Sequence, residues 1–482
     1  MARIIKVGGV GIPNIDAYPP KLSLLTRGLE ALRSMNAAHP SDKLVQDIAK
    51  VEKAIESRSK LYDYLDEKGG IKKGQKDDID EDAYEDLKSL AVDFYDAANI
   101  LNALPKNRTL PEKIKVKQLG GTITNKINAY KGGRGDNIKA FIIGVVGRDE
   151  EGSFIAGELL RRGITLLDNK IHCNATPFNY IITEDREGKP LGDRHILKGQ
   201  SNALKVLQEN EEQILKAAAG FDRLMIEGGE ISNKKFGHDL FAKILNEVIL
   251  NDLDLAYAPC TSSAAREEDP RNHAVLERAC FYKHNDMPTV FNVEELLDNY
   301  LPAHVKAGMN KDYKPKNKKT DPYVATAMAY LKLELAQREK LMPITNNQPL
   351  AIVSDGKNGL FIMTSDPAQT LFVPAATGVK VVDTTGAGDN LTAGAFVKAT
   401  QLANLHRNFN VGEKQKLSDN ELVEIAHFAQ KVAALAVEQY GACVDQDKIV
   451  RLLQEDLPVP VKANLVGVTK LGKPLEGAKH AR

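Results

Sequence analysis

Short apolar runs recur along the chain, and stretches with helical periodicity follow several of them. The run at Ala140–Val146 precedes a helical pattern at Ser153–Arg162, for example, and the run at Pro288–Phe291 precedes one at Val293–Tyr300. Strands that are buried on both faces appear as unbroken apolar runs, and parallel strands need crossover helices. The alternation therefore predicts an α/β fold with a mainly parallel sheet covered by helices. The predicted strands are Ile4–Val7, Ala140–Val146, Leu224–Ile226, Leu253–Ala258, Pro288–Phe291, Leu350–Ser354 and Gly359–Met363.

Three stretches break this alternation. Residues 20–104 have the apolar period of helices, in two stripes separated by a charged linker at 72–82, and Ser41 or Asp42 could cap one helix. This stretch predicts an insertion of two or three helices. The other two are charged stretches at about 264–287 and 301–340. We therefore divide the chain into a domain formed by 1–19 and 105–457, a helical insertion at 20–104, and an extended basic tail at 458–482.

The charge and hydropathy of the chain limit its partners. Lys and Arg number 65, as do Asp and Glu, so no global field favours nucleic acid or an anionic membrane. The chain lacks a long apolar run that would span a bilayer, and its N-terminal residues are expected to form a buried strand and not a signal peptide. The Lys-rich loop at 311–319 has no interleaved aromatic residues for stacking on bases. We therefore expect a cytoplasmic protein with neither a nucleic-acid nor a membrane partner.

The cysteines and histidines give no sign of a disulfide framework or a metal site. None of the four cysteines has a CxxC neighbour, and the ten histidines form no HExxH pattern. We expect reduced thiols at Cys173, Cys260, Cys280 and Cys443.

The stretch Asp383–Phe396, DTTGAGDNLTAGAF, joins the end of an apolar run to a helical pattern. Gly386-Ala387-Gly388 can begin a helix whose first N–H groups are unpaired, and the small side chains would let an anion approach them. Asp389 would lie in the first turn, where the carboxylate is stabilised in its ionised form. It would then be available to accept a proton from a hydroxyl that attacks a phosphoryl group.

Taken alone, this stretch could also be a strand-to-helix turn capped by an acid. A Rossmann dinucleotide site fits less well, because the third glycine is absent and the motif comes late in the chain. A P-loop is excluded because the chain has no GxxxxGK[ST] sequence.

Two further patterns lie upstream of this stretch. Gly120, Gly121 and Asn125 form a GG…N element, and a G-x-x-G-x-D-x-x-G pattern follows it at Gly144, Gly147, Asp149 and Gly152. With these motifs the chain resembles the ribokinase-like (PfkB) family of carbohydrate and nucleoside kinases. The upstream patterns match the family's first signature, and Asp383–Asp389 matches its second signature, D-T-x-G-A-G-D. The resemblance covers about residues 1–19, 110–260, 285–300 and 345–445.

The resemblance implies a ribokinase-like three-layer α/β/α sandwich with a small lid, to which the helical insertion is added. It implies ATP-dependent phosphotransfer to a primary hydroxyl of a sugar or sugar derivative. Asp389 would be the general base, and the backbone of Gly386, Ala387 and Gly388 would form the anion hole.

The resemblance also implies binding residues. Sugar hydroxyls would be bound at Asn14, Asp16, Gly120, Gly121 and Asn125. The nucleotide would lie beside Ser354 and Gly356, and Asn292 and Glu295 would organise Mg²⁺ through water. Many relatives also use K⁺ or another monovalent cation near the residue that matches Asp383. Simpler interpretations remain open: Asn292 and Glu295 could cap a helix, and Asp16 could be a turn acid.

Two departures from the family bear on the substrate. The helix after Asn125 is expected to be cut short by Lys131-Gly132-Gly133, which would reshape the substrate wall. The insertion begins soon after Asp16, where relatives form a lid and in some cases a dimer interface, so it either replaces part of the lid or lies beside it. A homodimer is one of the assemblies that the resemblance allows.

Two other functions stay open. One is a nucleoside kinase of the same fold. The other is an inert nucleotide-binding scaffold that contacts a protein partner through the insertion. A scaffold has no need for Asp389, the glycine turn and the Asn292/Glu295 pair together, which favours the enzyme.

Overall fold

The computed structural model describes residues 4–71, 76–80, 82–105, 110, 113–134, 138–167, 172–199, 201–227, 240, 243–244, 247, 254–258, 289–292, 350–366, 369–409, 417–455 and 469–470. Several predictions fall outside these residues: the helix Val293–Tyr300 with Glu295, the charged stretches at 264–287 and 301–340, the loop 311–319, Cys260 and Cys280.

A parallel sheet forms the centre of the molecule. Its hydrogen-bonded order is β7 (Ile164–Leu167), β5 (Ile138–Ile143), β1 (Ile5–Val10), β11 (Arg223–Glu227) and β12 (Asp254–Ala258). β12 lies beside β13 (Thr289–Asn292), which pairs in parallel with β14 (Leu350–Ser354). Antiparallel strands complete this edge, namely β15 (Gly359–Thr364), β16 (Thr370–Pro374) and the short β17 (Thr469–Lys470). Each predicted strand is present, with ends shifted by a few residues. The short β17 lies within the tail, which was predicted to be extended.

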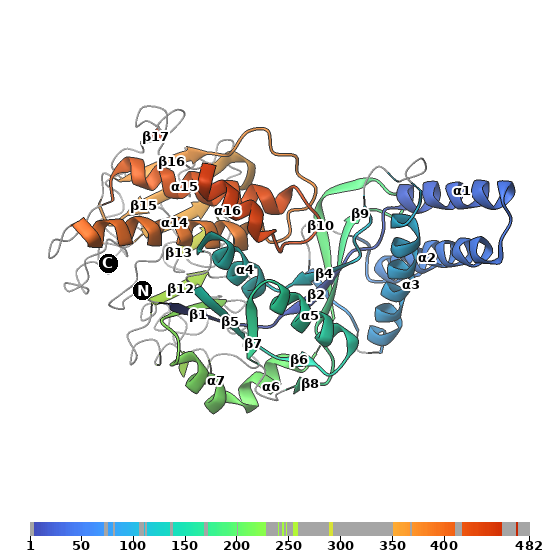
Figure 1. Cartoon of the computed structure of the whole chain (residues 1–482), viewed down its shortest axis with the longest axis horizontal. Coiled ribbons are helices and arrows are strands. Elements are labelled where there is room, and N and C mark those ends of the chain that lie inside the picture. The colour runs from blue at the N-terminus through green and yellow to red at the C-terminus, as the bar shows by residue number, and fades with distance from the viewer. Residues whose placement is uncertain are drawn as a thin grey trace.

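Helices cover both faces of this sheet (Figure 1). One face carries α4 (Thr122–Arg134), α14 (Ala387–Phe409), α15 (Asp419–Val437) and α16 (Gln446–Glu455), and the other carries α6 (Ala203–Glu209) and α7 (Glu211–Ala218). α5 (Glu150–Arg161) packs against β7. The predicted fold class, a three-layer α/β/α sandwich, is confirmed.

Helix α4 does not end at Lys131-Gly132-Gly133, and that expectation was wrong. A β-carbon at Gly132 would lie 3.1 Å from Cα of Gln446, and one at Gly133 would lie 2.5 Å from a methyl group of Val397. The two glycines therefore let α16 and α14 pack closely on α4.

A second sheet forms the lid. Its order is β3 (Lys76–Asp78), β10 (Pro190–Lys198), β9 (Phe178–Glu184), β2 (Asn14–Ala17) and β4 (Lys117–Gly120). β2 runs parallel to β9 and antiparallel to β4, and β3 runs parallel to β10. Since β3 comes from the stretch at 72–82, the prediction of a simple linker there was wrong for residues 76–78. A two-stranded ladder, β6 (Val146–Gly147) with β8 (His172–Cys173), lies apart from both sheets.

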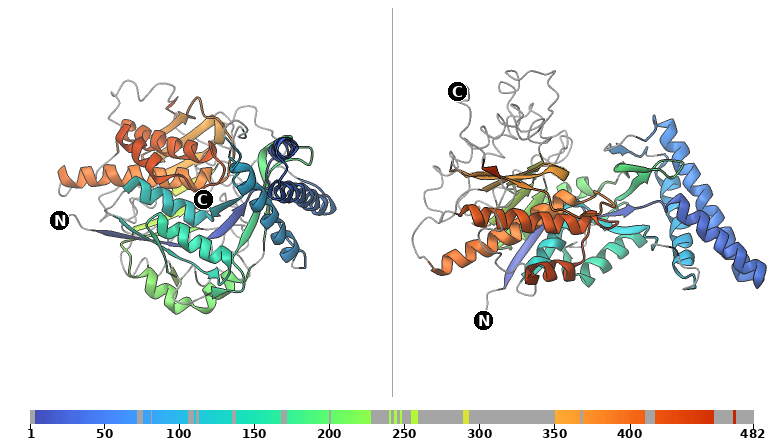
Figure 2. Two further views of the ribbon diagram at one scale, coloured as in Figure 1. Left: turned by 45° about the vertical axis from the view of Figure 1, so that its right-hand side comes forward. Right: turned by 90° about the horizontal axis from the view of Figure 1, so that it is seen from above.

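The described residues between 20 and 104 form three helices: α1 (Leu22–Ala38), α2 (Asp42–Glu67) and α3 (Tyr84–Asn102). Ser41 is the N-cap of α2, because its Oγ accepts a hydrogen bond from the Leu44 N–H. The helices pack on the lid, at the end of the molecule away from the central sheet (Figures 1 and 2). The insertion therefore supports the lid strands and does not replace them. The domain boundaries themselves stay a prediction.

Polar side chains fasten the insertion to the lid. The Tyr62 hydroxyl donates to the Glu184 carbonyl (2.6 Å), and the Tyr180 hydroxyl of β9 donates to the Leu87 carbonyl (2.8 Å). Arg58 is 4% exposed, and its guanidinium donates to the carbonyls of Asp185 (2.8 Å) and Arg186 (2.9 Å). Buried donors and acceptors of this kind make the contact specific, because removing one partner leaves the other unsatisfied.

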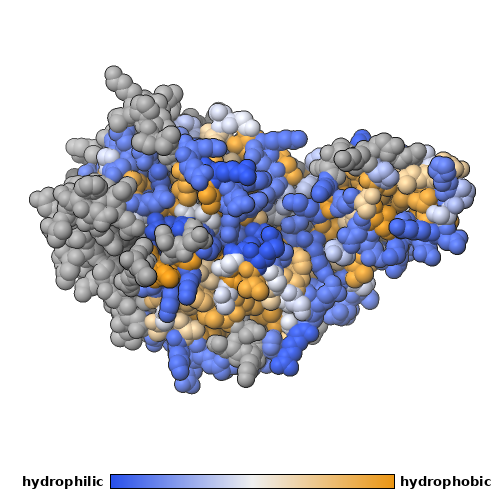
Figure 3. Space-filling view, in the orientation of Figure 1, coloured by the Kyte–Doolittle hydropathy of each residue, from blue (hydrophilic) through white to orange (hydrophobic). Residues whose placement is uncertain are grey.

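The surface of the insertion mixes hydrophilic and hydrophobic residues on the face shown in Figure 3, with hydrophobic residues reaching the surface between α1 and α2. Among the described helices, none is both long enough and apolar enough to cross a membrane. Cys173 and Cys443 carry free thiols, as predicted.

We predict that Arg58→Met destabilises the protein by about 3–5 kcal/mol, because it leaves the buried Glu184 carboxylate without its cation and two part-buried carbonyls without their donor. Urea unfolding would measure the loss. Lys60→Met is the control from the same helix: its ion pair with Glu56 is exposed and should contribute about 0.5 kcal/mol or less. Equal losses in the two variants would contradict the structural role of Arg58.

Candidate active site

The Asp383–Gly388 turn leads directly into helix α14. Gly386 has φ +73°, a left-handed conformation, and a β-carbon at this position would overlap the side chain of Ala442. Glycine is therefore required here for both backbone conformation and space. Asn390, one turn into the helix, donates from its side-chain amide to the carbonyls of Gly386 and Ala442, both at 2.8 Å. These bonds fix the turn against the loop at 441–444.

The three small residues present N–H groups at the start of α14. Ala387 N–H donates to the Thr384 carbonyl at 3.3 Å. Within the described chain, no acceptor is seen for the N–H groups of Gly386 and Gly388, and space around the Gly388 α-carbon is open. Two of the three predicted donors are thus available to an anion at the positive end of the helix dipole.

Asp389 lies in the first turn of α14, and helix α4 contributes two polar contacts to its carboxylate. The Asn125 amide donates to one carboxylate oxygen at 3.0 Å, and the Lys126 ammonium lies 3.7 Å from the other. The GG…N element therefore reaches the proposed base directly. The Asp389 side chain remains 16% exposed, so a ligand can approach it.

Asp383 anchors the turn from beneath. One carboxylate oxygen accepts from the Thr385 N–H (2.9 Å) and hydroxyl (2.6 Å). The other accepts from the Tyr18 hydroxyl (2.7 Å) and the Gly441 N–H (3.4 Å). Burial and the Asp383 charge hold the pKa of Tyr18 well above its usual range, so the phenol stays a donor.

This geometry does not fit Asp383 as a direct ligand of a monovalent cation. A carboxylate offers about four acceptor positions, and protein donors take all of them here. No described group of three or more His, Cys, Asp and Glu residues could hold a metal ion either.

Residues of the lid sheet lie on the side of the Asp383–Gly388 turn where an acceptor substrate was predicted to bind. A β-carbon at Gly120 would overlap the side chains of both Asn14 and Asp16, which places these predicted residues together. Oδ1 of Asn14 and Oδ1 of Asn125 are buried without a hydrogen-bond donor. Two buried acceptors of this kind are suited to hydroxyl groups of a ligand. Gly121, with φ +95° and a β-carbon position 2.7 Å from the Ile12 carbonyl, makes the tight turn into α4.

Asp16 is 4% exposed and accepts a hydrogen bond from the Asn179 amide at 3.3 Å. Its burial, reinforced by the charges of Asp383 and Asp389, raises its pKa to about 7. Asp16 therefore exists in both protonation states near neutral pH and can donate to or accept from a hydroxyl.

The second part of the first signature, the G-x-x-G-x-D-x-x-G pattern, has a structural role. Asp149 caps α5 by accepting from the Gly152 N–H (2.8 Å), and it also accepts from the N–H (2.9 Å) and the hydroxyl of Thr176. Thr176 in turn accepts from the Gly147 N–H at 2.9 Å. These bonds hold the segment that enters lid strand β9.

The predicted nucleotide residues meet at the ends of two neighbouring strands. Asn292 ends β13 directly opposite Ser354, which ends β14. Gly356, with φ +48°, begins the exposed 3₁₀ turn η5 (Gly356–Asn358). The structure therefore brings Asn292, Ser354 and Gly356 to one edge, whereas Glu295 lies outside the described residues.

Sequence reasoning missed several side chains that shape the site. Arg194 of the lid donates to the Thr384 hydroxyl of the turn at 2.6 Å. Most of the missed residues contact partners that are distant in the sequence, so no local spacing indicated them. The one available signal was Lys126, a lysine among buried positions of α4. The missed residues are Tyr18, Lys126, Asn179, Arg194, Asn390 and Gly441.

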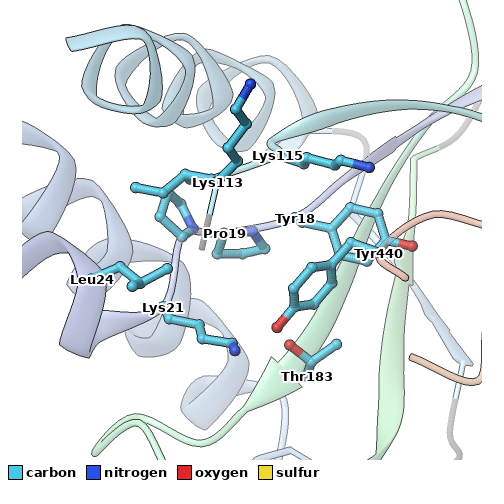
Figure 4. Close-up of a pocket in the computed structure, with 10 residues that line it drawn as sticks. Tyr18, Pro19, Lys21, Leu24, Lys113, Lys115, Thr183 and Tyr440 are labelled. Carbon is cyan, nitrogen blue, oxygen red and sulfur yellow. The ribbon is translucent and has the colours of Figure 1, made fainter. Parts of the chain in front are cut away.

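A small pocket beside Tyr18 is lined by residues of the insertion, the lid and the C-terminal loop. Lys21, Lys113 and Lys115 contribute to it, and the Lys21 ammonium lies 5.3 Å from the centre of the Tyr440 ring. Figure 4 shows the three ammonium groups directed away from one another. The pocket therefore lacks the converging charges of an anion site.

We predict that Asp16 makes the unliganded protein less stable as pH rises. The folded state holds the Asp16 proton up to about pH 7, whereas the unfolded carboxyl loses it near its ordinary pKa of 3.8. The free energy of unfolding should fall between these values, by at most about 4 kcal/mol. Asp16→Asn should therefore stabilise the protein more at pH 8 than at pH 5 in urea unfolding.

The control for this prediction is Asp78→Asn, at an exposed position of β3. It should leave the pH dependence of stability as in the wild type. If Asp16→Asn and Asp78→Asn gave the same dependence, burial of Asp16 would not perturb its titration.

Comparison with known proteins agrees with this arrangement. Residues 326–449, which include the Asp383–Asp389 signature, match the family model described as pfkB family carbohydrate kinase. The adenosine kinase from Sinorhizobium meliloti is 16% identical, with a TM-score of 0.55 over 94% of this chain and 100% of that chain. A probable sugar kinase from Rhizobium etli CFN 42 is 15% identical, with a TM-score of 0.55 over 94% and 98%. The adenosine kinase from Schistosoma mansoni in complex with 2-fluoroadenosine is 14% identical, with a TM-score of 0.52 over 92% and 98%. The chain therefore has the ribokinase-like fold of these kinases, and its resemblance to the PfkB family of carbohydrate and nucleoside kinases is confirmed.

Proposed function

We propose that the protein transfers a phosphoryl group from ATP to a primary hydroxyl of a sugar or sugar derivative. The observation that carries this proposal is the position of Asp389. Its carboxylate lies in the first turn of α14, beside the N–H groups of Gly386 and Gly388, and is oriented by the Asn125 amide. A base and an anion site side by side are the main requirements of phosphoryl transfer.

In the proposed reaction Asp389 accepts the proton of the acceptor hydroxyl. The acceptor oxygen bonds to the γ-phosphorus as the bond to the β–γ bridging oxygen breaks, and ADP leaves. The backbone N–H groups of Gly386 and Gly388 donate to the transferred phosphoryl group, with Ala387 between them. These groups lie at the start of α14 before the reaction begins, so little reorganisation is needed.

The acceptor would lie between the lid and the turn. Hydroxyl groups of the acceptor would donate to the buried Oδ1 atoms of Asn14 and Asn125, and Asp16 would exchange hydrogen bonds with a neighbouring hydroxyl. A side chain at Gly120 would displace Asn14 and Asp16 from their positions. The Arg194–Thr384 bond would hold the lid near the turn.

The nucleotide would lie at the edge formed by Asn292, Ser354 and Gly356. Mg²⁺ held through water by Asn292 and Glu295 would neutralise charge on the triphosphate. For Asp383 we propose an anchoring role in place of the monovalent-cation role, because its acceptor positions are already filled. The protein is proposed to work in the cytoplasm on a small molecule, without nucleic acid; a homodimer stays a prediction.

A nucleoside kinase is the alternative supported by a specific observation, since two of the similar structures are adenosine kinases. A nucleoside also offers a primary hydroxyl, so the same base and anion hole would serve it. ATP consumption should be measured with pentoses, hexoses, sugar phosphates and nucleosides in the presence of Mg²⁺, with and without K⁺. Turnover of a nucleoside alone would select the alternative, and ATP binding without turnover of any acceptor would favour a scaffold.

We predict that Asp389→Asn lowers kcat by about 10²–10⁴-fold while ATP affinity is retained, because the base is lost and the N–H groups remain. Steady-state kinetics and equilibrium ATP binding would measure the two effects. Asp447→Asn is the matched control, because Asp447 is also in the first turn of a helix, α16, and is exposed. Turnover near the wild-type value in Asp389→Asn would refute the mechanism.

A further inference from the structure

Lys126 is a buried cation in the middle of the candidate site. Its side chain is 5% exposed, although lysine is among the residues that are seldom buried. Removing an ammonium group from water is unfavourable by several kcal/mol unless negative charge compensates it. A lysine at this position therefore needs a nearby anion.

The anion beside it is the proposed base. The Lys126 ammonium lies 3.7 Å from Oδ1 of Asp389, and the amide of the preceding residue, Asn125, donates to Oδ2 at 3.0 Å. Two adjacent residues of α4 thus contact the two oxygens of one carboxylate, one by a hydrogen bond and the other by an ion pair. Both come from the first turns of the helix, close to the rigid turn at Gly121.

The surrounding charges make this pairing important. Asp16, from lid strand β2, interacts unfavourably with both Asp383 and Asp389, and Arg194 of β10 offsets part of this charge. The hydrogen-bond donors around Asp383 are neutral N–H and O–H groups, so the negative charge of this carboxylate remains in the site. An ammonium at 3.7 Å stabilises negative charge on Asp389, which keeps this carboxylate able to accept a proton.

We propose that Lys126 is a positioning residue for phosphoryl transfer: together with Asn125 it orients the Asp389 carboxylate toward the acceptor hydroxyl. This inference rests on the proposed role of Asp389. During the reaction the hydroxyl proton passes to Asp389, and Lys126 takes no part in the proton transfer. Lys126 affects the rate only through Asp389, and it takes no part in binding the adenine or ribose of ATP.

The first experiment needs no turnover. Thermal unfolding is measured for the wild type, Lys126→Met, Asp389→Asn and the double variant. If the ion pair exists, Lys126→Met is tolerated better in the Asp389→Asn background than in the wild type, so the two changes in Tm do not add. Additive changes would overturn the pairing, whatever reaction the protein catalyses.

The second experiment tests the effect on the reaction. With an acceptor found in the screen, Lys126→Met should lower kcat by about 10–100-fold, with KM for ATP within about twofold of the wild type. Lys126→Arg, which keeps the charge, should recover a larger kcat than Lys126→Met. Lys131→Met is the control: it lies on the same helix, and its ammonium donates to the Ile138 carbonyl at 3.0 Å, away from Asp389.

The outcomes separate this inference from the proposed function. If Asp389→Asn abolishes turnover but Lys126→Met behaves like Lys131→Met, the positioning role is wrong and the mechanism stands. Equal loss of kcat in Lys126→Met and Lys131→Met would indicate damage to α4 and would also overturn the positioning role. Wild-type turnover in Asp389→Asn would refute the function itself, while the unfolding experiment would still decide whether the pair exists.

Discussion

The carboxylate of Asp383 holds together three segments that are far apart in the sequence. It accepts hydrogen bonds from Tyr18, 365 residues away, from Thr385 in its own turn, and from Gly441 in the loop before α16. Tyr18 directly follows lid strand β2, so the bond links the lid to the turn that begins α14. Because Gly386 and Asp389 follow within six residues, their positions depend on this anchor. The same hydrogen bonds explain why Asp383 is poorly suited to a cation.

The helical insertion acts on the site through the lid. Arg58 and Tyr62 bind the backbone at 184–186, at the end of β9, and Tyr180 in the same strand binds back to α3. Strand β9 also carries Asn179, which donates to Asp16. The insertion therefore stabilises the strand that orients an acceptor-side carboxylate. A lid of a few strands has little core of its own, and added helices supply the apolar surface against which it packs.

The sequence was sufficient for features that depend on local patterns. The parallel strands, the Ser41 cap and the glycine turn before Asp389 were predicted because apolar runs, capping residues and small residues act on their neighbours. The end of α4 was mispredicted because Gly132 and Gly133 are explained by packing against α14 and α16, which spacing does not reveal. Strand β3 was missed because its pairing with β10 overrides a charged composition. Tyr18, Lys126 and Arg194 were missed for the same reason, since each acts on a residue more than 180 positions away.

The three carboxylates of the site have different tasks, and their surroundings separate them. Asp383 is surrounded by donors and serves as an anchor. Asp16 has one amide donor and little solvent, so its pKa rises to about 7 and it can carry a proton at neutral pH. Asp389 has an amide on one oxygen and an ammonium beside the other, and its side chain stays 16% exposed at the start of α14. A proton acceptor must keep its charge until the acceptor hydroxyl arrives. Of the three carboxylates, Asp389 is the one with both a cation beside it and an open approach, which is why the arrangement favours it as the base.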